Sequence, residues 1–311
     1  MRIVRNAIIG AVAVALAAPV VTYAYVDQHM NRSVDLAGIT AKRPEPGKGT
    51  NTLLVGSDSR QGLSEEDRNR LRVGHEPTKR TDTMMIVHQG EHGTTLVSLP
   101  RDSWVEIPDF VGKDSGKKYP ATKNKLNAAY AWGGAELLTR TVEHNTGIRV
   151  DHYVEIGFKG FADIVNAVGG VEIDIKRRIK DKNSGADFQP GKQTLTGEQA
   201  LAFVRQRYQE AQGDLGRTTN QQEFMKALSK KVGASNALGV AASALGSLEF
   251  DKGMGVLDLS DFALKFGEPE SLNVPVSNLG YQTSKGSAVL WDDSKARNLF
   301  QAIVNDRKVT K

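Results

Sequence analysis

A run of 20 uncharged, mostly apolar residues near the N-terminus, residues 7–26, constrains this chain more than any other feature. As an α-helix with about 1.5 Å of rise per residue it would be about 30 Å long, the thickness of the hydrocarbon core of a bilayer. Arg2 and Arg5 precede the run and Asp27 follows it, which orients the N-terminus toward the cytoplasm. We therefore expect a cytoplasmic tail at 1–6, a transmembrane helix at 7–26 and an external remainder.

A cleaved signal peptide is the alternative explanation of this run, because small residues around Ala24 permit cleavage. The run is longer than the roughly 7–15 apolar residues of a signal-peptide core. Tyr23 and Tyr25 at its outer end are typical of a membrane interface. We therefore favour an uncleaved signal anchor and single-pass localisation in the cell membrane.

The segment after the run, residues 27–49, is polar and carries two prolines and two glycines within residues 44–49. Such a cluster favours an extended, irregular chain. We expect an extracellular stalk over 27–49 and a folded domain over 50–311.

Composition excludes several classes of chemistry. None of the 311 residues is cysteine, so disulfides, thiolate catalysis and cysteine-ligated zinc or iron–sulfur sites are excluded. The sequence also lacks a nucleophile elbow, a P-loop, a dinucleotide-binding fingerprint and a zincin helix. The formal charge of +5, from 41 basic and 36 acidic residues, permits anionic partners without indicating nucleic acid.

Short apolar runs alternate with amphipathic stretches along the rest of the chain. The runs predict strands at 51–56, 83–88, 94–99, 152–156, 171–175, 272–276 and 288–291. The amphipathic stretches predict helices at 127–145, 159–168, 196–207, 221–232 and 293–304. This alternation is typical of an α/β fold around one central sheet.

Two aspartates stand at ends of expected strands. Asp58 follows the first strand in GSDSR (56–60), and Asp82 precedes the second in KRTDT (79–83). If the two strands are neighbours, the carboxylates lie at one sheet edge and suit a hard cation such as magnesium, whose other ligands are water and substrate phosphates. A turn-capping role for each aspartate explains the spacing equally well.

Basic residues concentrate at two further places. Arg101 follows Pro100 at the end of the third expected strand, where proline stops strand pairing. Arg205 and Arg207 lie only two residues apart, so a helix end from which both reach one ligand explains them better than a solvated helix face. Arginine is matched to phosphate, although an ordinary ion-pair network with the nearby Glu210 and Asp214 is an equal alternative.

Seven segments, in this order, resemble the LytR-CpsA-Psr family of bacterial cell-wall proteins: VGSDSR (55–60), KRTDTMMIV (79–87), VSLPRDSWV (97–105), NKLNAAYAWGG (124–134), VGGVEIDI (168–175), LTGEQALAFVRQRY (195–208) and DLGRTTNQQEF (214–224). The core of the resemblance covers about residues 51–232, and segments 272–277 and 289–300 resemble the C-terminal part of the family. The resemblance implies a single LytR-CpsA-Psr domain with a central mixed sheet, flanking helices and an apolar lipid pocket, after an N-terminal transmembrane helix.

The resemblance also implies a function. Such an enzyme moves an anionic or secondary cell-wall glycopolymer from a polyprenyl diphosphate carrier onto peptidoglycan, forming a phosphodiester and releasing polyprenyl phosphate. The implied partners are the lipid-linked glycopolymer, peptidoglycan and the membrane bilayer, and no nucleic acid.

The family's functional residues match this chain position by position. The residues associated with Mg²⁺, or Mn²⁺, are Asp58 and Asp82. The matching diphosphate-binding set is Arg80, Arg101, Lys125, Arg205, Arg207, Arg217 and Gln221. The expected catalytic set is Asp82, Arg101, Arg205, Arg207 and Asp214, with Asp214 or Asp82 as the base. Asn220 stands where many members have arginine, so we expect no phosphate contact from that position.

A polyprenyl chain needs an apolar tunnel beside the charged residues. Met85, Val87, Phe158, Phe161 and Val165 are candidates for its lining, with an ordinary place in the core as the alternative for each.

Three other functions remain open from the sequence. The same site could hydrolyse the polyprenyl diphosphate with water, or the chain could bind polyprenyl lipids in wall assembly without catalysis. A nucleic-acid role would use the basic run at 176–180, which we instead expect to be a solvated loop outside the membrane.

Overall fold

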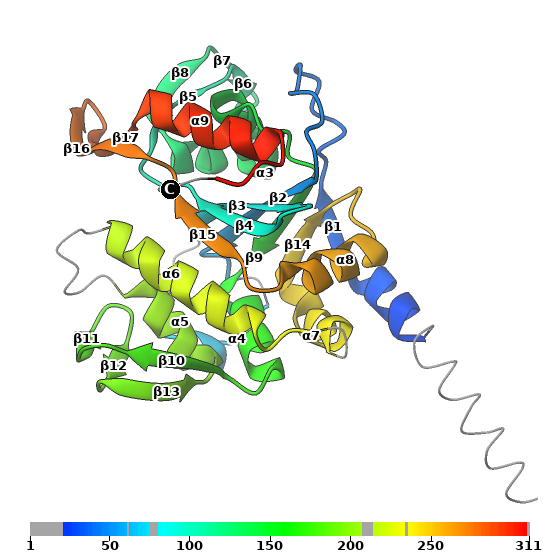
Figure 1. The fold of residues 1–311 in the computed structure, drawn as a ribbon, viewed down its shortest axis with the longest axis vertical. Coiled ribbons are helices and arrows are strands. Elements are labelled where there is room, and N and C mark those ends of the chain that lie inside the picture. The colour runs from blue at the N-terminus through cyan, green and yellow to red at the C-terminus, as the bar shows by residue number, and fades with distance from the viewer. Residues whose placement is uncertain (1–20, 61, 75–79, 207–213, 234–235, 310–311) are drawn as a thin grey trace, which may run out of the picture.

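A seven-stranded mixed sheet forms the centre of the molecule (Figure 1). The computed structural model describes residues 21–60, 62–74, 80–206, 214–233 and 236–309, without the side chains of 214–217 and 238. In spatial order the sheet consists of β1 (Asn31–Val34), β14 (Leu248–Asp251), β9 (His152–Ile156), β2 (Thr50–Ser57), β3 (Thr81–Gly90), β4 (Gly93–Ser98) and β15 (Glu270–Asn273). Strands β2, β3 and β4 pair antiparallel, whereas β2 pairs parallel with β9 and β4 parallel with β15.

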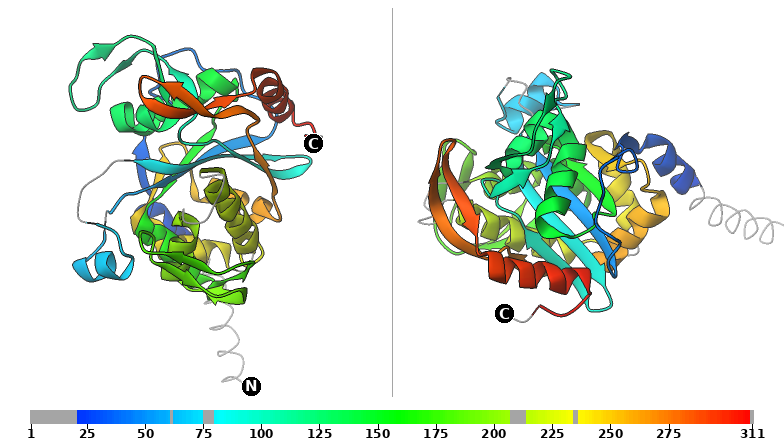
Figure 2. Two further views of the ribbon diagram at one scale, coloured as in Figure 1. Left: turned by 90° about the vertical axis from the view of Figure 1, so that its left-hand side faces the viewer. Right: turned by 90° about the horizontal axis from the view of Figure 1, so that it is seen from above.

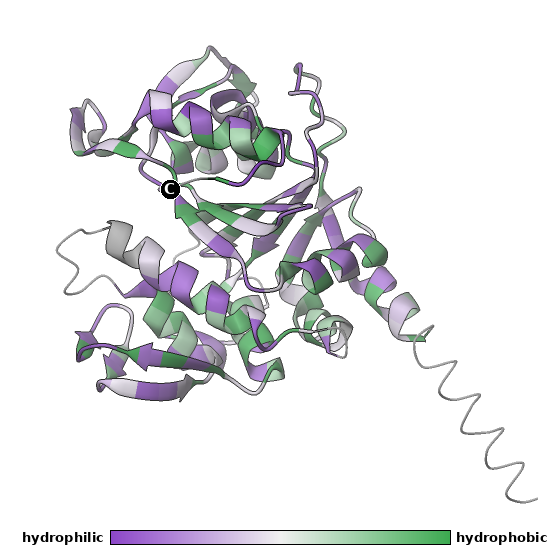
Figure 3. Cartoon of the chain, viewed as in Figure 1, coloured by the Kyte–Doolittle hydropathy of each residue, from purple (hydrophilic) through white to green (hydrophobic). Residues whose placement is uncertain are grey.

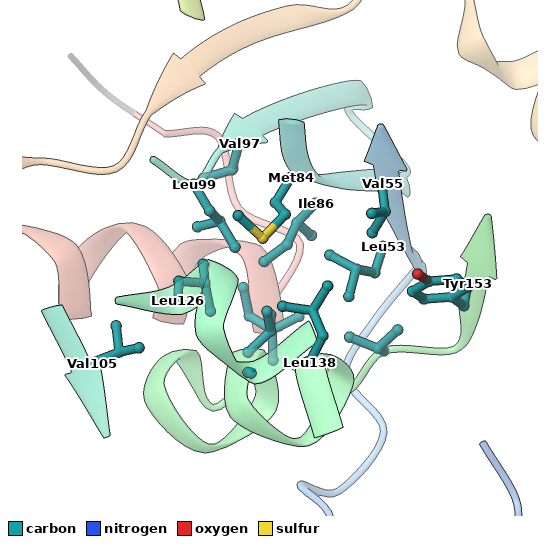
Figure 4. Packing of buried hydrophobic residues seen from close by; sticks show 14 of the residues in the cluster. Leu53, Val55, Met84, Ile86, Val97, Leu99, Val105, Leu126, Leu138 and Tyr153 are labelled. Atoms are coloured by element: carbon teal, nitrogen blue, oxygen red, sulfur yellow. The ribbon is translucent and has the colours of Figure 1, made fainter. Parts of the chain in front are cut away.

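One face of the sheet is covered by α3 (Leu126–Thr146) and α9 (Asp293–Val304). Leu53, Met84, Ile86 and Tyr153 from the strands are at most 1% exposed and pack with Leu138 of α3 (Figure 4). Short antiparallel pairs extend this layer: β5 (Trp104–Ile107) with β8 (Thr122–Lys125), β6 (Phe110–Val111) with β7 (Lys118–Tyr119), and β16 (Val276–Thr283) with β17 (Gly286–Trp291).

The opposite face carries the other large helices, as the left view of Figure 2 shows. They are α4 (Phe158–Ala167), α5 (Gly197–Arg205), α6 (Asp214–Ser229), α7 (Ala237–Ala244) and α8 (Val256–Phe266), with the short α2 (Glu65–Arg70) and the 3-10 turn η1 (Leu245–Ser247). Two small hairpins pack beside α5: β10 (Val171–Ile175) with β13 (Gly191–Leu195), and β11 (Ile179–Asp181) with β12 (Ala186–Phe188). Hydrophobic residues gather in the central strands and in the helices next to them (Figure 3).

The α/β class and the mixed central sheet with flanking helices are confirmed. The expectation of a single sheet is wrong for two of the expected strands, because β10 pairs with β13 and β17 pairs with β16 outside the central sheet. The basic run at 176–180 is also only partly a loop, since β11 begins at Ile179.

The expected stalk over 27–49, with a domain starting near residue 50, is wrong. Residues 21–29 are helical, β1 pairs parallel with β14 at the sheet edge, and Val34 is 5% exposed. Arg43 lies 2.6 Å from the buried carboxylate of Glu143 on α3. The partners of this segment are distant in the sequence, so its local composition conceals its place in the fold.

No helix in the described part of the chain is long and apolar enough to cross a membrane. Residues 1–20, which hold most of the expected anchor, lie outside the described residues. Val26, which we expected at the end of the anchor, is fully buried in the domain core.

Candidate active site

An apolar cavity of about 370 Å³ lies between the central sheet and helices α4, α5 and α6. Its sheet wall is formed by Leu54, Met85 and Ile156. Its helix wall includes Phe158, Phe161, Leu201, Val204, Phe224 and Met225. Of the residues expected to line a lipid tunnel, Met85, Phe158 and Phe161 line this cavity, whereas Val87 and Val165 are buried in the core and do not line it.

Charged and polar residues line the same cavity. Asp58 comes directly after β2, Asp82 lies on β3, Arg205 ends α5 and Gln221 lies on α6. Four segments that are far apart in the sequence therefore place polar groups beside one apolar space.

The pairing of β2 with β3 explains why the two aspartates are neighbours. The register is regular to Gly56 and Thr83 and then shifts by one residue at Ser57 and Thr81. Beyond the shift, the Asp58 N–H donates to the Arg80 carbonyl (3.0 Å), and the Arg80 N–H donates to Asp58 Oδ1 (2.9 Å). The expectation that both carboxylates reach the same end of the sheet is confirmed, while Arg80 itself has an exposed side chain outside the cavity lining.

Arg101 is joined to the site through Asp82. Its Nη1 donates to Asp82 Oδ1 at 2.5 Å, and its Nε lies 3.5 Å from Asp102 Oδ2. Lys125 Nζ lies 3.4 Å from Asp102 Oδ1. Because Asn127 N–H at the start of α3 donates to the Arg101 carbonyl (3.0 Å), the backbone that carries this arginine is fixed.

Arg205 occupies the last position of α5, two residues before the end that we expected for this helix. Helix α5 begins with a capping box between Thr196 and Gln199 and ends where Gln206 becomes extended. The guanidinium carbon of Arg205 lies 4.9 Å above the Phe158 ring centroid, a cation–π contact that holds its position.

Three expected site residues cannot be placed by their side chains. Arg207 lies outside the described residues, and only the helical backbone of Asp214 and Arg217 in α6 is described. Helix α6 itself is fixed to the sheet because Gln222 Nε2 donates to Ser98 Oγ (2.8 Å) and to the Leu272 carbonyl (3.0 Å).

The turn between β11 and β12 also lines the cavity, through Asp181, Asn183 and Ser184. We did not predict a role for this turn, although its polar sequence DKNSG (181–185) marks it as a tight turn. Asn183 N–H donates to Asp181 Oδ1 (2.8 Å), so the turn is shaped by its own first residue.

The side chains that line the cavity determine which metal ion could bind there. No group of three or more histidine, aspartate or glutamate side chains that could hold a metal ion occurs among the described residues. Asp58 and Asp82, at the end of the β2–β3 pair, supply two carboxylates, and the third aspartate of the lining, Asp181, forms no such group with them. This donor set fits Mg²⁺ or Mn²⁺, which take their remaining ligands from water and phosphate, better than it fits zinc.

Comparison with known proteins gives the family. Residues 20–292 match the LytR_cpsA_psr family. The probable cell wall biosynthesis protein LcpB of Corynebacterium glutamicum is 39% identical over 306 residues, which cover 95% of this chain and 70% of LcpB. The polyisoprenyl-teichoic acid–peptidoglycan teichoic acid transferase TagU of Enterococcus faecalis is 38% identical over 179 residues, 57% of this chain and 54% of TagU.

A solved structure agrees with these sequence relatives. The structure of TagT bound to LI-WTA is 25% identical, with a TM-score of 0.62, and the match covers 89% of this chain and 100% of that one. The chain spans about half the length of TagU and more than two thirds of LcpB. By its sequence over almost its whole length and by its fold, this chain belongs to the LytR-CpsA-Psr family.

Proposed function

We propose that this chain is a phosphotransferase that moves an anionic or secondary cell-wall glycopolymer from a polyprenyl diphosphate carrier onto peptidoglycan. The observation that carries the proposal is the apolar cavity of about 370 Å³ with Asp58, Asp82 and Arg205 in its lining. Such a space offers apolar walls to a lipid chain and, beside them, charged side chains to its head group. The relative TagU, named as a polyisoprenyl-teichoic acid–peptidoglycan teichoic acid transferase, supports the same substrate class.

The cavity would take the first part of the polyprenyl chain. Burial of each methylene contributes about 0.8 kcal/mol, and the rings of Phe158, Phe161 and Phe224 line the space. The head group would then lie where Asp58 and Asp82 end the β2–β3 pairing.

Arg101 and Arg205 would bind the diphosphate. Arginine presents a planar set of donors that matches phosphate oxygens, and both guanidinium groups are already held, by Asp82 and by Phe158. Donors that are in place before the reaction stabilise developing charge without reorganisation. Lys125 is linked to the same network through Asp102, and the resemblance adds Arg80, Arg207, Arg217 and Gln221 to this set.

The reaction is a phosphoryl transfer, in which positioning and charge stabilisation do most of the work. A sugar hydroxyl oxygen of peptidoglycan attacks the glycopolymer-side phosphorus, the bond from that phosphorus to the bridging oxygen breaks, and polyprenyl phosphate leaves with the electron pair. The hydroxyl proton passes to Asp82 or Asp214. Arg101 and Arg205 hold the departing phosphate.

Asp58 and Asp82 would hold Mg²⁺ or Mn²⁺. The ion would supply positive charge to the diphosphate oxygens, and the two carboxylates of this chain would orient it.

We also propose that the domain acts outside the cell and is tethered to the membrane through the apolar run at 7–26, whose last residue, Val26, already lies in the domain core. The apolar run supports this topology. The helix at 21–29 exposes 65% of Val21, 43% of Tyr23 and 51% of Tyr25, the apolar and aromatic surface expected near a lipid interface.

Replacement of Arg101 tests the proposed function. With a polyprenyl-diphosphate-linked glycan and peptidoglycan as substrates, we expect Arg101→Ala to lower kcat about 10²–10³-fold, the usual cost of removing one charge-stabilising donor. Circular dichroism should show an unchanged fold, because Arg101 is partly exposed and outside the hydrophobic core. If Arg101→Ala transferred the polymer with the wild-type kcat, Arg101 would have no part in the reaction.

The products separate the alternative functions in the same assay. A polymer–peptidoglycan adduct supports the transferase, polymer phosphate formed from water identifies a hydrolase, and lipid binding without turnover identifies a carrier. A magnesium titration of Asp82→Ala checks the metal assignment, since we expect both activity and metal dependence to disappear.

A further inference from the structure

A second hollow begins at Asp58, which also lines the apolar cavity, and runs in another direction. One part of it, about 490 Å³, contains Ser57 and Asp58, which also line the apolar cavity. The other part, about 500 Å³, reaches Tyr119 and Trp132. The two parts share Lys113 and Asp114. We call the joined space the α3 groove: Ser57 and Asp58 mark its inner end, Lys113 and Asp114 its middle, and Tyr119 and Trp132 its outer end.

The α3 groove and the apolar cavity lie on opposite faces of the central sheet. Side chains alternate between the faces along a strand, and on β9 Ile156 lines the cavity while its neighbour Glu155 lines the groove. The groove is completed by Tyr130 from α3, which covers the face opposite to α4, α5 and α6. Among the residues that the structure describes, the two spaces share Ser57 and Asp58, at the end of β2.

The inner end of the groove is polar and fixed. Tyr130 Oη donates to Glu155 Oε1 and Tyr153 Oη donates to Glu155 Oε2, both at 2.7 Å. Glu155 is 4% exposed, and its burial raises the pKa of its carboxyl. A hydroxyl-rich ligand would meet hydrogen-bonding groups here whose positions are already set.

The outer end is an aromatic platform. The Phe110 ring stacks on Trp132, with centroids 5.6 Å apart and 9° between the planes, and on Tyr119, at 5.1 Å and 18°. Tyr119 is 41% exposed. The faces of such rings carry partial negative charge, so they attract the C–H face of a sugar ring, whose hydroxyls could then reach Lys113 and Asp114.

A kink in α3 holds this platform in place. Gly134 has φ 69° and ψ −157° inside the helix, a conformation that favours glycine. The Trp132 carbonyl accepts a hydrogen bond from the Lys113 N–H at 2.9 Å, outside the helix. The strand pair that carries Tyr119 is therefore tied to α3, and the groove is largely formed before a ligand binds.

We propose that the α3 groove binds the acceptor, a glycan strand of peptidoglycan, and delivers its hydroxyl at Asp58. The inference rests on the proposed function. In a phosphoryl transfer the attacking and leaving oxygens lie roughly in line. Because the leaving polyprenyl phosphate belongs to the cavity on one face, the attacking hydroxyl approaches from the opposite face, where the groove opens.

Tyr119 variants of the full chain test the proposal with soluble peptidoglycan glycan strands as acceptor. We expect Tyr119→Ala to raise the acceptor KM about ten-fold, equal to about 1.4 kcal/mol, and to leave the donor KM near its wild-type value. Tyr119→Phe keeps the ring and should keep the acceptor KM. Tyr281→Ala is the matched control, because Tyr281 is 38% exposed on β16 outside the groove.

Two results would overturn the proposal. One is an unchanged acceptor KM in both Tyr119→Ala and Lys113→Ala. The other is a rise in the donor KM alone, which would assign the groove to the glycan of the donor.

A direct binding measurement separates this proposal from the proposed function. The same strands are titrated without donor, and the affinities of wild type and Tyr119→Ala are compared. If the protein binds the strands in a Tyr119-dependent way but transfers no polymer, the proposed transferase function is refuted and glycan binding in the α3 groove is supported. Absence of binding by the wild type would refute the groove, whatever the transfer assay shows.

Discussion

The two faces of the central sheet are built from alternate side chains of the same strands, yet the central strands are tightly packed on the α3 face and border a cavity on the other face. By this packing over the central strands we call them the closed face and the open face. On the α3 face, Leu53, Ile86 and Tyr153 are fully buried in a continuous cluster (Figure 4). On the opposite face, Leu54 and Met85 line a cavity of about 370 Å³. A single residue step along β2, from Leu53 to Leu54, therefore separates a position in the closed core from one that lines the cavity.

The difference arises from how the covering helices are themselves packed. Helix α3 and α9 share one cluster with the strands beneath them. On the other face α4 and α5 share a cluster with the strands β10–β13, while a separate cluster joins α7 and α8 to the sheet. Helices with their own core need fewer contacts with the sheet, so a space remains between the two clusters.

The matched pair Leu53→Ala and Leu54→Ala should show the largest difference between the faces. Leu53→Ala leaves a void in the closed cluster and is expected to lower the free energy of unfolding by about 3–4 kcal/mol. Leu54→Ala should cost about 2 kcal/mol or less, because a side chain that borders a cavity has fewer contacts to lose. Denaturant unfolding measures both, and equal losses would contradict the distinction between the faces.

Filling the cavity should separate binding from stability. Ile156→Trp places a larger side chain in the cavity wall. If it displaces about three methylene groups of a polyprenyl chain at about 0.8 kcal/mol each, lipid affinity falls roughly 50-fold. Binding of a fluorescent polyprenyl phosphate checks this, with Leu279→Trp on the exposed strand β16 as the control. Unchanged affinity in Ile156→Trp would mean that the lipid binds elsewhere.

The closed face is also the part of the fold that the sequence predicts best. The apolar runs give β2, β3, β4 and β9 within about two residues, and the spacing of apolar residues gives α3. Such signals are local. The edge strand β1 was missed because its partner Glu249 lies more than 200 residues later, and Asn31–Val34 carries one apolar residue only.

The open face shows what a sequence cannot reveal about a site. Motifs at strand and helix ends bring Asp58, Asp82 and Arg205 together, as expected. The cavity beside them depends on the gap between two clusters of side chains, and no single segment encodes that gap. For the same reason Val87, equally apolar and close to Met85, lies in the closed core instead of the lining.

His152 offers the smallest but most selective test, because it joins strands of the sheet without touching the cavity. Its Nδ1 lies 3.2 Å from Asp251 Oδ2 on β14, and this hydrogen bond raises the pKa of His152, with smaller contributions from the charges of Asp258 and Asp151. A raised pKa in the folded state stabilises the fold below the unfolded pKa of about 6.5, and this stabilisation disappears as pH rises through the folded pKa.

His152→Gln should therefore cost about 1.5–3 kcal/mol at pH 5.5, the value of one hydrogen bond between charged groups, and clearly less at pH 8.5. Asp251 keeps the hydrogen bonds from the N–H groups of Tyr153 (3.0 Å) and Gly253 (2.9 Å), so the variant leaves no unpaired buried carboxylate. Unfolding curves at the two pH values measure the difference. An equal cost at both would show that the imidazole acts by packing alone. If His152→Gln also changed the affinity for lipid, the shape of the cavity would depend on the β9–β14 pairing. Stability and lipid binding could then not be changed independently at this edge of the sheet.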